Sequence, residues 1–197
     1  MRKVVASQLV SLDGVMEAPE KWHLPYFNNE MWQVDEVVMA DSDAMLLGRV
    51  TYEQFAAFWP YQDRAEQPYT DYLNNTPKYV VSTTLEEPLE WQNSTLIKGN
   101  VAEEISRLKE QPGKDISIVG SGTLVRWLLR ENLLDELRLM VHTILLGGGK
   151  RLFEEGEIRR RWSSSTRRRS ERASSTSPTS WHRAEAFRGL DLFTSAL

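Results

Sequence analysis

The chain has 197 residues, 41% of them hydrophobic and seven of them Trp, which suits one domain with a sizeable core. It contains no Cys, which excludes disulfides, thiol nucleophiles and Cys-ligated zinc, and its three His are widely separated, so no metal site is predicted. No apolar run reaches membrane-spanning length and no signal peptide is recognisable, so a cytoplasmic protein without a membrane partner is expected.

The charge is unevenly distributed along the chain. Residues 1–156 carry 15 Lys and Arg against 24 Asp and Glu, whereas residues 157–197 carry nine Arg against four acidic residues. We therefore expect one folded domain over residues 1–156, followed by a tail of a different kind.

The first strand is predicted over residues 3–12 from its β-branched content, and Asp13-Gly14 marks the turn that ends it. A long loop over residues 15–27 follows, and loops of this length in compact domains are often binding loops. Trp22 within it has two interpretations, contact with a ligand or packing against the core, and the sequence does not decide between them.

Helices and strands then alternate. Helices are predicted over residues 31–40, from Gly48-Arg49 through Phe58, over 69–73 and over 101–110, and strands over 44–47, 78–82, 95–98 and 137–146. Asn28 or Asn29 is expected to cap the first helix, and Asn100 with Glu103 to form a capping box at the last. This alternation predicts an α/β fold with a mostly parallel central sheet and helices on both faces.

The most informative stretch covers residues 115–130. Its apolar start predicts a buried strand, Gly120-Ser121-Gly122 a turn, and the apolar periodicity that follows a helix. Glycine lets the backbone approach a ligand closely, and the free N–H groups that open a helix favour phosphate. A tight connection without any ligand has the same pattern, so this motif alone leaves both interpretations open.

Other strand exits carry phosphate-binding groups as well. They are Gly48-Arg49, Ser82-Thr83-Thr84 and Lys98. In a parallel sheet these exits meet at the carboxyl edge, where ligands bind. Guanidinium, hydroxyl and backbone N–H donors all suit phosphate oxygens. Together the exits predict an extended ligand with phosphates, such as a dinucleotide.

The ordered motifs carry a resemblance to known families. Residues 46–53, 81–84 and 120–124 resemble segments of the dihydrofolate reductase fold. Ser-Leu-Asp-Gly at 11–14, Asp-Glu-Leu-Arg at 135–138 and the Leu-Gly-Gly-Gly-Lys segment at 146–153 resemble the reductase domain of the bacterial bifunctional riboflavin-biosynthesis deaminase/reductase and its stand-alone relatives. The resemblance covers residues 3 to about 156.

The resemblance implies a dihydrofolate-reductase-like three-layer fold and an NADPH-dependent reductase similar to 5-amino-6-(5-phosphoribosylamino)uracil reductase, acting on a small heterocyclic or ribosylamino substrate. It implies a cofactor site made of Gly48, Arg49, Thr51, Ser82 and Thr83 on the adenosine and phosphate side, and of Gly120, Ser121, Gly122, Thr123 and Leu124 under the pyrophosphate and nicotinamide. Asp13, Gly14 and the Trp22 loop would border the substrate.

Three single residues have open roles. Asp13 is the candidate catalytic residue, which would orient or protonate the substrate, although a carboxylate beside Gly is also a common turn former. Lys150 follows three glycines and either attracts a substrate phosphate or is a solvated loop lysine. His142 lies among apolar residues and is expected to be a hydrogen-bonded core histidine.

The sequence differs from the two families at two points, and each difference argues against one activity. Dihydrofolate reductases carry a proton-relay carboxylate two residues after a Trp-x-Leu-Pro segment, and the matching position here is Phe27. Dihydrofolate is therefore a poor substrate candidate, and the zinc deaminase half has no Cys ligands. The alternatives to a reductase are a non-catalytic dinucleotide-binding protein of the same fold and an inactive frameshifted product.

The strand predicted at 137–146 is apolar at nearly every position. Such a strand is either central in the sheet or meets a partner with its outer face. The related reductases are homodimers, and the resemblance implies the same for an intact form of this chain.

The tail at 157–197 lacks hydrophobic periodicity and is rich in Ser and Arg. Synonymous codons for residues 162–180 permit a shifted frame that reads LELVDSQTFGTGVLHLTYV, which resembles the final strand of the reductase family. We therefore interpret the tail as out of frame and expect it to be disordered, with the C-terminal edge strand of the sheet lost. A basic arm at 159–180 that binds nucleic acid is the less favoured interpretation.

Overall fold

The computed structural model describes residues 1–63 and 69–154. Its elements in chain order are β1 (Val4–Ser11), the short 3-10 helices η1 (Pro19–Lys21) and η2 (Leu24–Tyr26), α1 (Asn29–Asp41), β2 (Ser42–Gly48), α2 (Arg49–Phe58), η3 (Trp59–Tyr61), α3 (Thr70–Asn75), β3 (Lys78–Val81), β4 (Ser94–Ile97), α4 (Val101–Glu110), β5 (Asp115–Val119), α5 (Gly122–Arg130) and β6 (Glu136–His142). The predicted tail lies outside the described residues.

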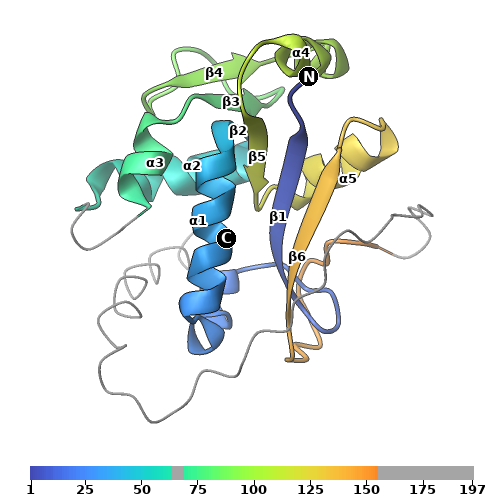
Figure 1. The fold of residues 1–197 in the computed structure, drawn as a ribbon. Coiled ribbons are helices and arrows are strands. Elements are labelled where there is room, and N and C mark those ends of the chain that lie inside the picture. Colours follow the sequence, from blue (N-terminus) through green and yellow to red (C-terminus); the bar gives the residue numbers. More distant parts are fainter. Residues whose placement is uncertain (64–68, 155–197) are drawn as a thin grey trace. The chain divides into compact units, whose positions relative to one another are not determined.

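Six strands form one sheet in the order β4-β3-β2-β5-β1-β6 (Figure 1). The pairs β1–β5, β5–β2, β2–β3 and β3–β4 are all parallel. Asp135 lies just before β6 and donates its backbone N–H to the Val4 carbonyl at 3.0 Å, so β6 begins beside the start of β1. The predicted α/β fold with a parallel sheet is therefore confirmed.

The sheet is buried because its central strands are apolar on both faces. Leu46 and Leu47 of β2 point to opposite faces of the sheet and are both fully buried, and so are Ile116 and Ile118, which share one face of β5. Each residue of this kind contributes roughly 1.5–3 kcal/mol when it leaves water. The apolar runs that predicted these strands therefore also build the core.

The described chain divides into two compact units. One consists of the described residues among 1–8 and 38–140 and holds most of the sheet, and the other consists of residues 9–37 and the described residues that follow residue 140. The phosphate-binding exits predicted from the sequence belong to the first unit, whereas Asp13, Trp22 and Lys150 belong to the second.

The last described strand is shorter than predicted. β6 ends at His142 instead of residue 146, because Ile144 donates its N–H to the carbonyl of His142 at 2.8 Å in a local turn. The N–H of Leu146 is bonded by the Asp13 carboxylate at 3.2 Å. Because these N–H groups bond a local carbonyl and a carboxylate instead of a neighbouring strand, the strand ends at His142 although the apolar residues continue to Leu146.

β6 is the last strand at one end of the sheet among the described residues, so within this part of the chain the alternative of a central strand does not apply. Leu139 and Val141 are 41% and 55% exposed. These side chains leave an exposed apolar surface on the strand. This fits the other alternative, a strand whose outer face meets a partner.

The two helix caps turn out differently. The side chain of Asn28 accepts the N–H of Met31 at 3.0 Å, so the predicted cap of α1 is confirmed. Asn100 has a left-handed backbone with φ of 44° and its side chain caps nothing, so the capping box with Glu103 is wrong. A capping side chain needs an extended backbone at its own residue, and Asn100 does not have one.

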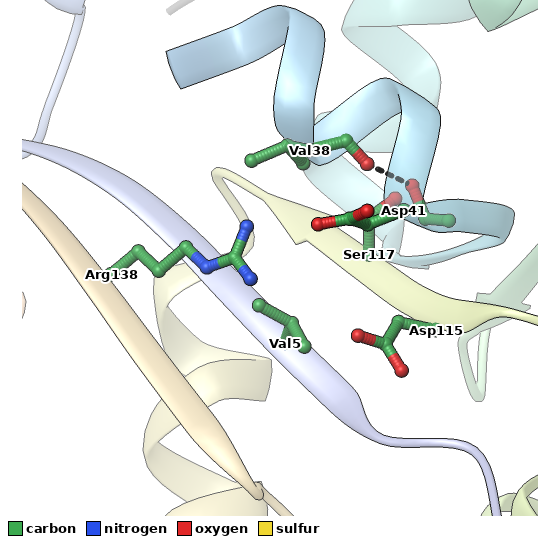
Figure 2. Close-up of a pocket in the computed structure, with 7 residues that line it drawn as sticks. Val5, Val38, Asp41, Asp115, Ser117 and Arg138 are labelled. Atoms are coloured by element: carbon green, nitrogen blue, oxygen red, sulfur yellow. Dashed lines mark hydrogen bonds between the residues drawn. The ribbon is translucent and has the colours of Figure 1, made fainter. Parts of the chain in front are cut away.

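A small cavity lies at the amino ends of the strands, under the last turn of α1 (Figure 2). Arg138 of β6 reaches across β1 toward Asp41, and Ser42 donates its hydroxyl to the Val38 carbonyl at 2.5 Å. The volume of about 10 Å³ has room for one water molecule. This cavity therefore has no space for a substrate.

Within the described residues, no helix combines the length and the apolar character that crossing a membrane requires.

Candidate functional site

The candidate site begins at the carboxyl edge of the sheet, where the connections of β2 and β5 diverge. These strands are neighbours, yet β2 leads toward β3 on one side, and β5 leads toward β6 on the other, beyond β1. Ligands in open α/β sheets bind at such a switch point, outside the carboxyl ends of the strands. Gly48 ends β2 and Gly120 follows β5, so the predicted cofactor segments meet here.

Two hydroxyl groups join the two turns. The Ser121 hydroxyl accepts the N–H of Gly48 at 3.0 Å, and the Thr51 hydroxyl accepts the N–H of Ser121 at 3.0 Å. Gly120 has φ of +63°, and a Cβ there would lie 3.2 Å from Thr51 Oγ1. The structure therefore brings Gly48, Thr51, Gly120 and Ser121 together as predicted, with Thr51 and Ser121 bonded to backbone of the opposite turn.

Two helices start from these turns without a side-chain cap. α2 follows Gly48 and α5 follows Ser121, and neither preceding residue makes a side-chain cap. The first N–H groups of a helix have no partner within it, and the helix dipole adds positive potential at the same place. Gly122, Thr123 and Leu124 form the first turn of α5, so the predicted phosphate-side residues lie at a helix start suited to an anion.

The other predicted contacts on the adenosine side have partners within the chain. Arg49 donates to Glu53 at 2.8 Å along α2, and both side chains are about half exposed. The Ser82 hydroxyl accepts the N–H groups of Thr84 and Leu85, each at 3.1 Å, and so forms the turn after β3. Thr83 is exposed beside that turn. Ser82 therefore shapes the exit of β3, whereas Arg49 and Thr83 are accessible to a ligand.

Asp13 is in the second unit and organises the glycine loop that follows β6. Its carboxylate accepts the Ser11 hydroxyl at 2.6 Å and the N–H groups of Leu146 and Gly147 at 3.2 and 2.9 Å. The Ser11 hydroxyl and then these two N–H groups lower the pKa of Asp13 to about 2. These hydrogen bonds therefore favour the ionised form of Asp13 at neutral pH.

Gly14 and Lys150 lie in the same loop pair. Leu152 donates its N–H to the Gly14 carbonyl at 3.0 Å, and Met16 donates to the carbonyl of Lys150 at 2.9 Å. Glu17 accepts the Lys150 N–H at 3.1 Å, and its carboxylate lies 3.4 Å from the Lys150 ammonium. Because Glu17 neutralises it, Lys150 offers a substrate phosphate less attraction than the sequence alone suggests.

Trp22 is buried in the second unit. Its indole N–H donates to the Glu17 carbonyl at 2.9 Å, and its ring packs edge-on against His142 with centroids 5.2 Å apart. The structure therefore shows Trp22 packed against the core of this unit, as the packing interpretation predicts.

His142 has a partner that the sequence did not reveal. Its Nε2 lies 2.8 Å from Nδ1 of His23, and both imidazoles are buried, so the prediction of a hydrogen-bonded core histidine is confirmed. Burial, and secondarily the neighbouring His142, lower the pKa of His23 to about 4. The Trp-His-Leu-Pro segment gives no sign of this pair, because no sequence pattern links two residues that are 119 positions apart.

Among the described residues, no group of three or more His, Asp and Glu side chains is arranged to hold a metal ion.

Comparisons with known proteins show which family and which relatives the chain resembles. The RibD C-terminal domain family matches residues 2–177. Two relatives from Bacillus subtilis (strain 168) are the uncharacterized proteins YyaP, 31% identical over 77% of this chain and 80% of its own length, and YwjB, 30% identical over 78% and 84%.

Solved structures share the fold. A protein from Shewanella sp. PV-4, described as a riboflavin biosynthesis protein, matches with a TM-score of 0.61 and 26% identity over 80% of this chain and 86% of its own. Dihydrofolate reductase from Enterococcus faecalis, solved with NADP(H), matches with a TM-score of 0.54 and 15% identity over 77% of each chain. The second match shows a dihydrofolate-reductase-like fold and nothing more.

Proposed function

Because the chain belongs to the RibD C-terminal domain family, we propose that it is an NADPH-dependent reductase acting on a small heterocyclic or ribosylamino substrate. The observation that carries the proposal is the pair of uncapped helix starts at the switch point, joined through Thr51 and Ser121. Such a pair suits the phosphates of a dinucleotide.

The residues at this edge fit the parts of NADPH. The N–H groups that open α2 and α5 would hold the pyrophosphate, and Gly120 would let the backbone approach it. The guanidinium of Arg49, now paired with Glu53 on the surface, would turn to the adenosine 2'-phosphate, with Thr83 beside it. Bound NADPH would supply the hydride, and the protein would supply binding and orientation.

Asp13 enters this proposal as a positioning residue. Its ionised carboxylate holds the loop at Leu146 and Gly147, which with Gly14 and Trp22 would border the substrate. Since Asp13 stays ionised at neutral pH, the proton that completes the reduction would come from solvent water. The cytoplasmic location and the homodimer predicted from the sequence belong to the same proposal.

Cofactor choice tests the proposal directly. Titration of Trp fluorescence should show NADPH binding at least about tenfold more tightly than NADH, because a charge-assisted bond from Arg49 to the 2'-phosphate contributes roughly 1.5–3 kcal/mol. Arg49→Ala should remove most of that preference. Arg107→Ala is the matched control, because Arg107 also forms an ion pair within a helix, with Glu104 of α4. Equal affinity for both cofactors would refute the assignment.

Turnover distinguishes an enzyme from a binding protein of the same fold. The chain should oxidise NADPH, followed at its absorbance band, when a ribosylaminopyrimidine substrate is added. The binding-protein alternative has support in Phe27, which replaces an acid, and in the low pKa of Asp13. Tight NADPH binding without oxidation across heterocyclic and ribosylamino substrates would favour that alternative.

A further inference from the structure

The side-chain amide of Gln8 on β1 is buried without a hydrogen-bond partner for its NH₂ group. Gln8 is 1% exposed, and its Nε2 has no partner among the residues that the structure describes. A buried amide donor that bonds nothing costs roughly 1–3 kcal/mol, and native structures contain few such groups. The position therefore calls for an acceptor that the described residues do not provide.

The sheet register places this amide at the switch point. Ser7 of β1 pairs with Val119 of β5, so Gln8 continues the register to Gly120. Met45 of β2 pairs with Ser117 of β5, and the same continuation brings Gly48 to Gly120. On three adjacent strands, Gln8 within β1, Gly48 at the end of β2 and Gly120 just after β5 thus lie in one row across the sheet.

The order of the strands indicates which part of the proposed cofactor would lie beside Gln8. In the sheet order, Ser82-Thr83 follows β3, the helix starts follow β2 and β5, and Gln8 belongs to β1. Neighbouring strands are about 4.8 Å apart, so β1 lies about 10 Å from β2 along the edge. A dinucleotide with its adenosine near β3 and its pyrophosphate at the helix starts would bring its nicotinamide ring to β1.

We propose that the Gln8 side-chain amide donates a hydrogen bond to the carboxamide oxygen of the nicotinamide ring. This inference rests on the proposed function, because it names one contact of the same cofactor. The carboxamide oxygen of the ring is an acceptor that an amide NH₂ group can bond, and it is the polar group that the nicotinamide end of the cofactor would bring to β1. Gln8 is then a positioning residue that fixes the rotation of the ring about its glycosidic bond.

The test compares two ligands and two side chains. NADPH carries the nicotinamide ring, and 2'-phospho-ADP-ribose lacks it but keeps every phosphate. Gln8→Met keeps the unbranched length and removes the donor, and Ser7→Ala is the matched control, because the Ser7 hydroxyl is also buried without a partner, on the opposite face of β1. Dissociation constants come from Trp fluorescence, and the thermal midpoint is measured with and without each ligand.

The proposal expects Gln8→Met to weaken NADPH about tenfold and to leave 2'-phospho-ADP-ribose unchanged. Without ligand, the variant should unfold at a temperature no lower than wild type, since it loses an unsatisfied donor. Ser7→Ala should leave both affinities unchanged. If Gln8→Met does not fold, Gln8→Leu serves in its place with the same expectations.

Two results would overturn the proposal in distinguishable ways. If wild type binds both ligands and the variant loses neither affinity, or loses both equally, Gln8 does not contact the ring and the cofactor site stands. If wild type binds neither ligand, the proposed function fails and this contact fails with it.

Discussion

The carboxylate of Asp13 accepts hydrogen bonds from one hydroxyl and two backbone N–H groups, and these donors favour its ionised form. Its folded pKa of about 2 lies below the ordinary value of 3.8, so the unfolded chain takes up this proton first as the pH falls. Its contribution to stability is therefore complete above about pH 4 and is lost as the pH falls to about 2.

Asp13→Asn should remove the part of the pH dependence of stability that comes from Asp13. The thermal midpoint of wild type should fall faster than that of the variant between pH 4 and pH 2, and at pH 7 the variant should be less stable because an amide cannot accept all three bonds. Glu20→Gln is the control for loss of one carboxylate from the same unit. Parallel midpoint curves for wild type and Asp13→Asn would contradict the assignment.

His23 titrates in a separate, higher pH window. Its folded pKa of about 4 lies below the ordinary 6.5, so the unfolded chain binds the proton first. The contribution of neutral His23 to the free energy of unfolding is complete above about pH 6.5. It decreases by about 3 kcal/mol in total as the pH falls to about 4. The groups that face the pair are Trp22, Tyr26 and Phe27, and Tyr26 is the titratable one among them.

His23→Leu tests this dependence by removing the titrating group. The free energy of unfolding, measured in urea from pH 7 to pH 4.5, should vary less with pH than in wild type. At pH 7 the variant should be destabilised by roughly 1–3 kcal/mol, because His142 loses its buried partner. An unchanged slope would show that His23 does not carry the pH dependence.

Among the elements, α2 and α5 are linked by a pair of side-chain hydrogen bonds across the switch point. Thr51 belongs to the first turn of α2, and Ser121 directly precedes α5. Because each hydroxyl accepts a backbone N–H of the opposite turn, the two helix starts keep a defined spacing. A pyrophosphate that contacts both helix starts needs that spacing before it arrives.

Thr51→Val keeps the shape of the side chain and removes the acceptor for the Ser121 N–H. It should cost roughly 1–3 kcal/mol of unfolding free energy in urea and weaken NADPH binding, while Thr51→Ser should restore both. Thr70→Val is the control, because the Thr70 hydroxyl at the start of α3 is also buried but has no hydrogen-bond partner among the described residues, so its loss should change neither stability nor affinity. A stable Thr51→Val variant with normal affinity would refute this role.

For the whole molecule, the exposed apolar residues of β6 predict a second copy of the chain as partner. Leu139 and Val141 lie on the last described strand of the sheet, where uncovered apolar surface favours association. Light scattering should show a dimer at micromolar concentration. Leu139→Lys should give a folded monomer by circular dichroism, and Val37→Lys, a control at a residue of α1 that is 52% exposed, should stay dimeric. A monomeric wild type would count against the prediction.

The tail at 157–197 lies outside the described residues, so its interpretation stays a prediction. The codons of residues 157–184 should encode the strand-like sequence LELVDSQTFGTGVLHLTYV in the shifted frame. If the gene's nucleotide sequence does not do so, the frameshift is refuted and the basic tail returns as a candidate binding arm.

The sequence alone determined the kind and order of the elements and the exits that carry the candidate site. Strand and helix periods and glycine turns are local signals, so β5, the turn at Gly120 and α5 were predicted close to their observed limits. The wrong prediction of a cap at Asn100 also came from a local pattern, because the Asn-x-x-Glu spacing does not indicate that the backbone of Asn100 is left-handed.

Only the tertiary structure decided which partners these residues have. Asp13 meets Gly147 and Thr51 meets Ser121 across 134 and 70 residues. Lys78 looked like an ordinary strand residue, yet it is fully buried and donates to the carbonyls of Leu73 and Thr76 at the end of α3. Such contacts depend on how distant segments pack, and each side chain bonds whichever group the fold brings to it, so no pattern within a short window of sequence reveals them.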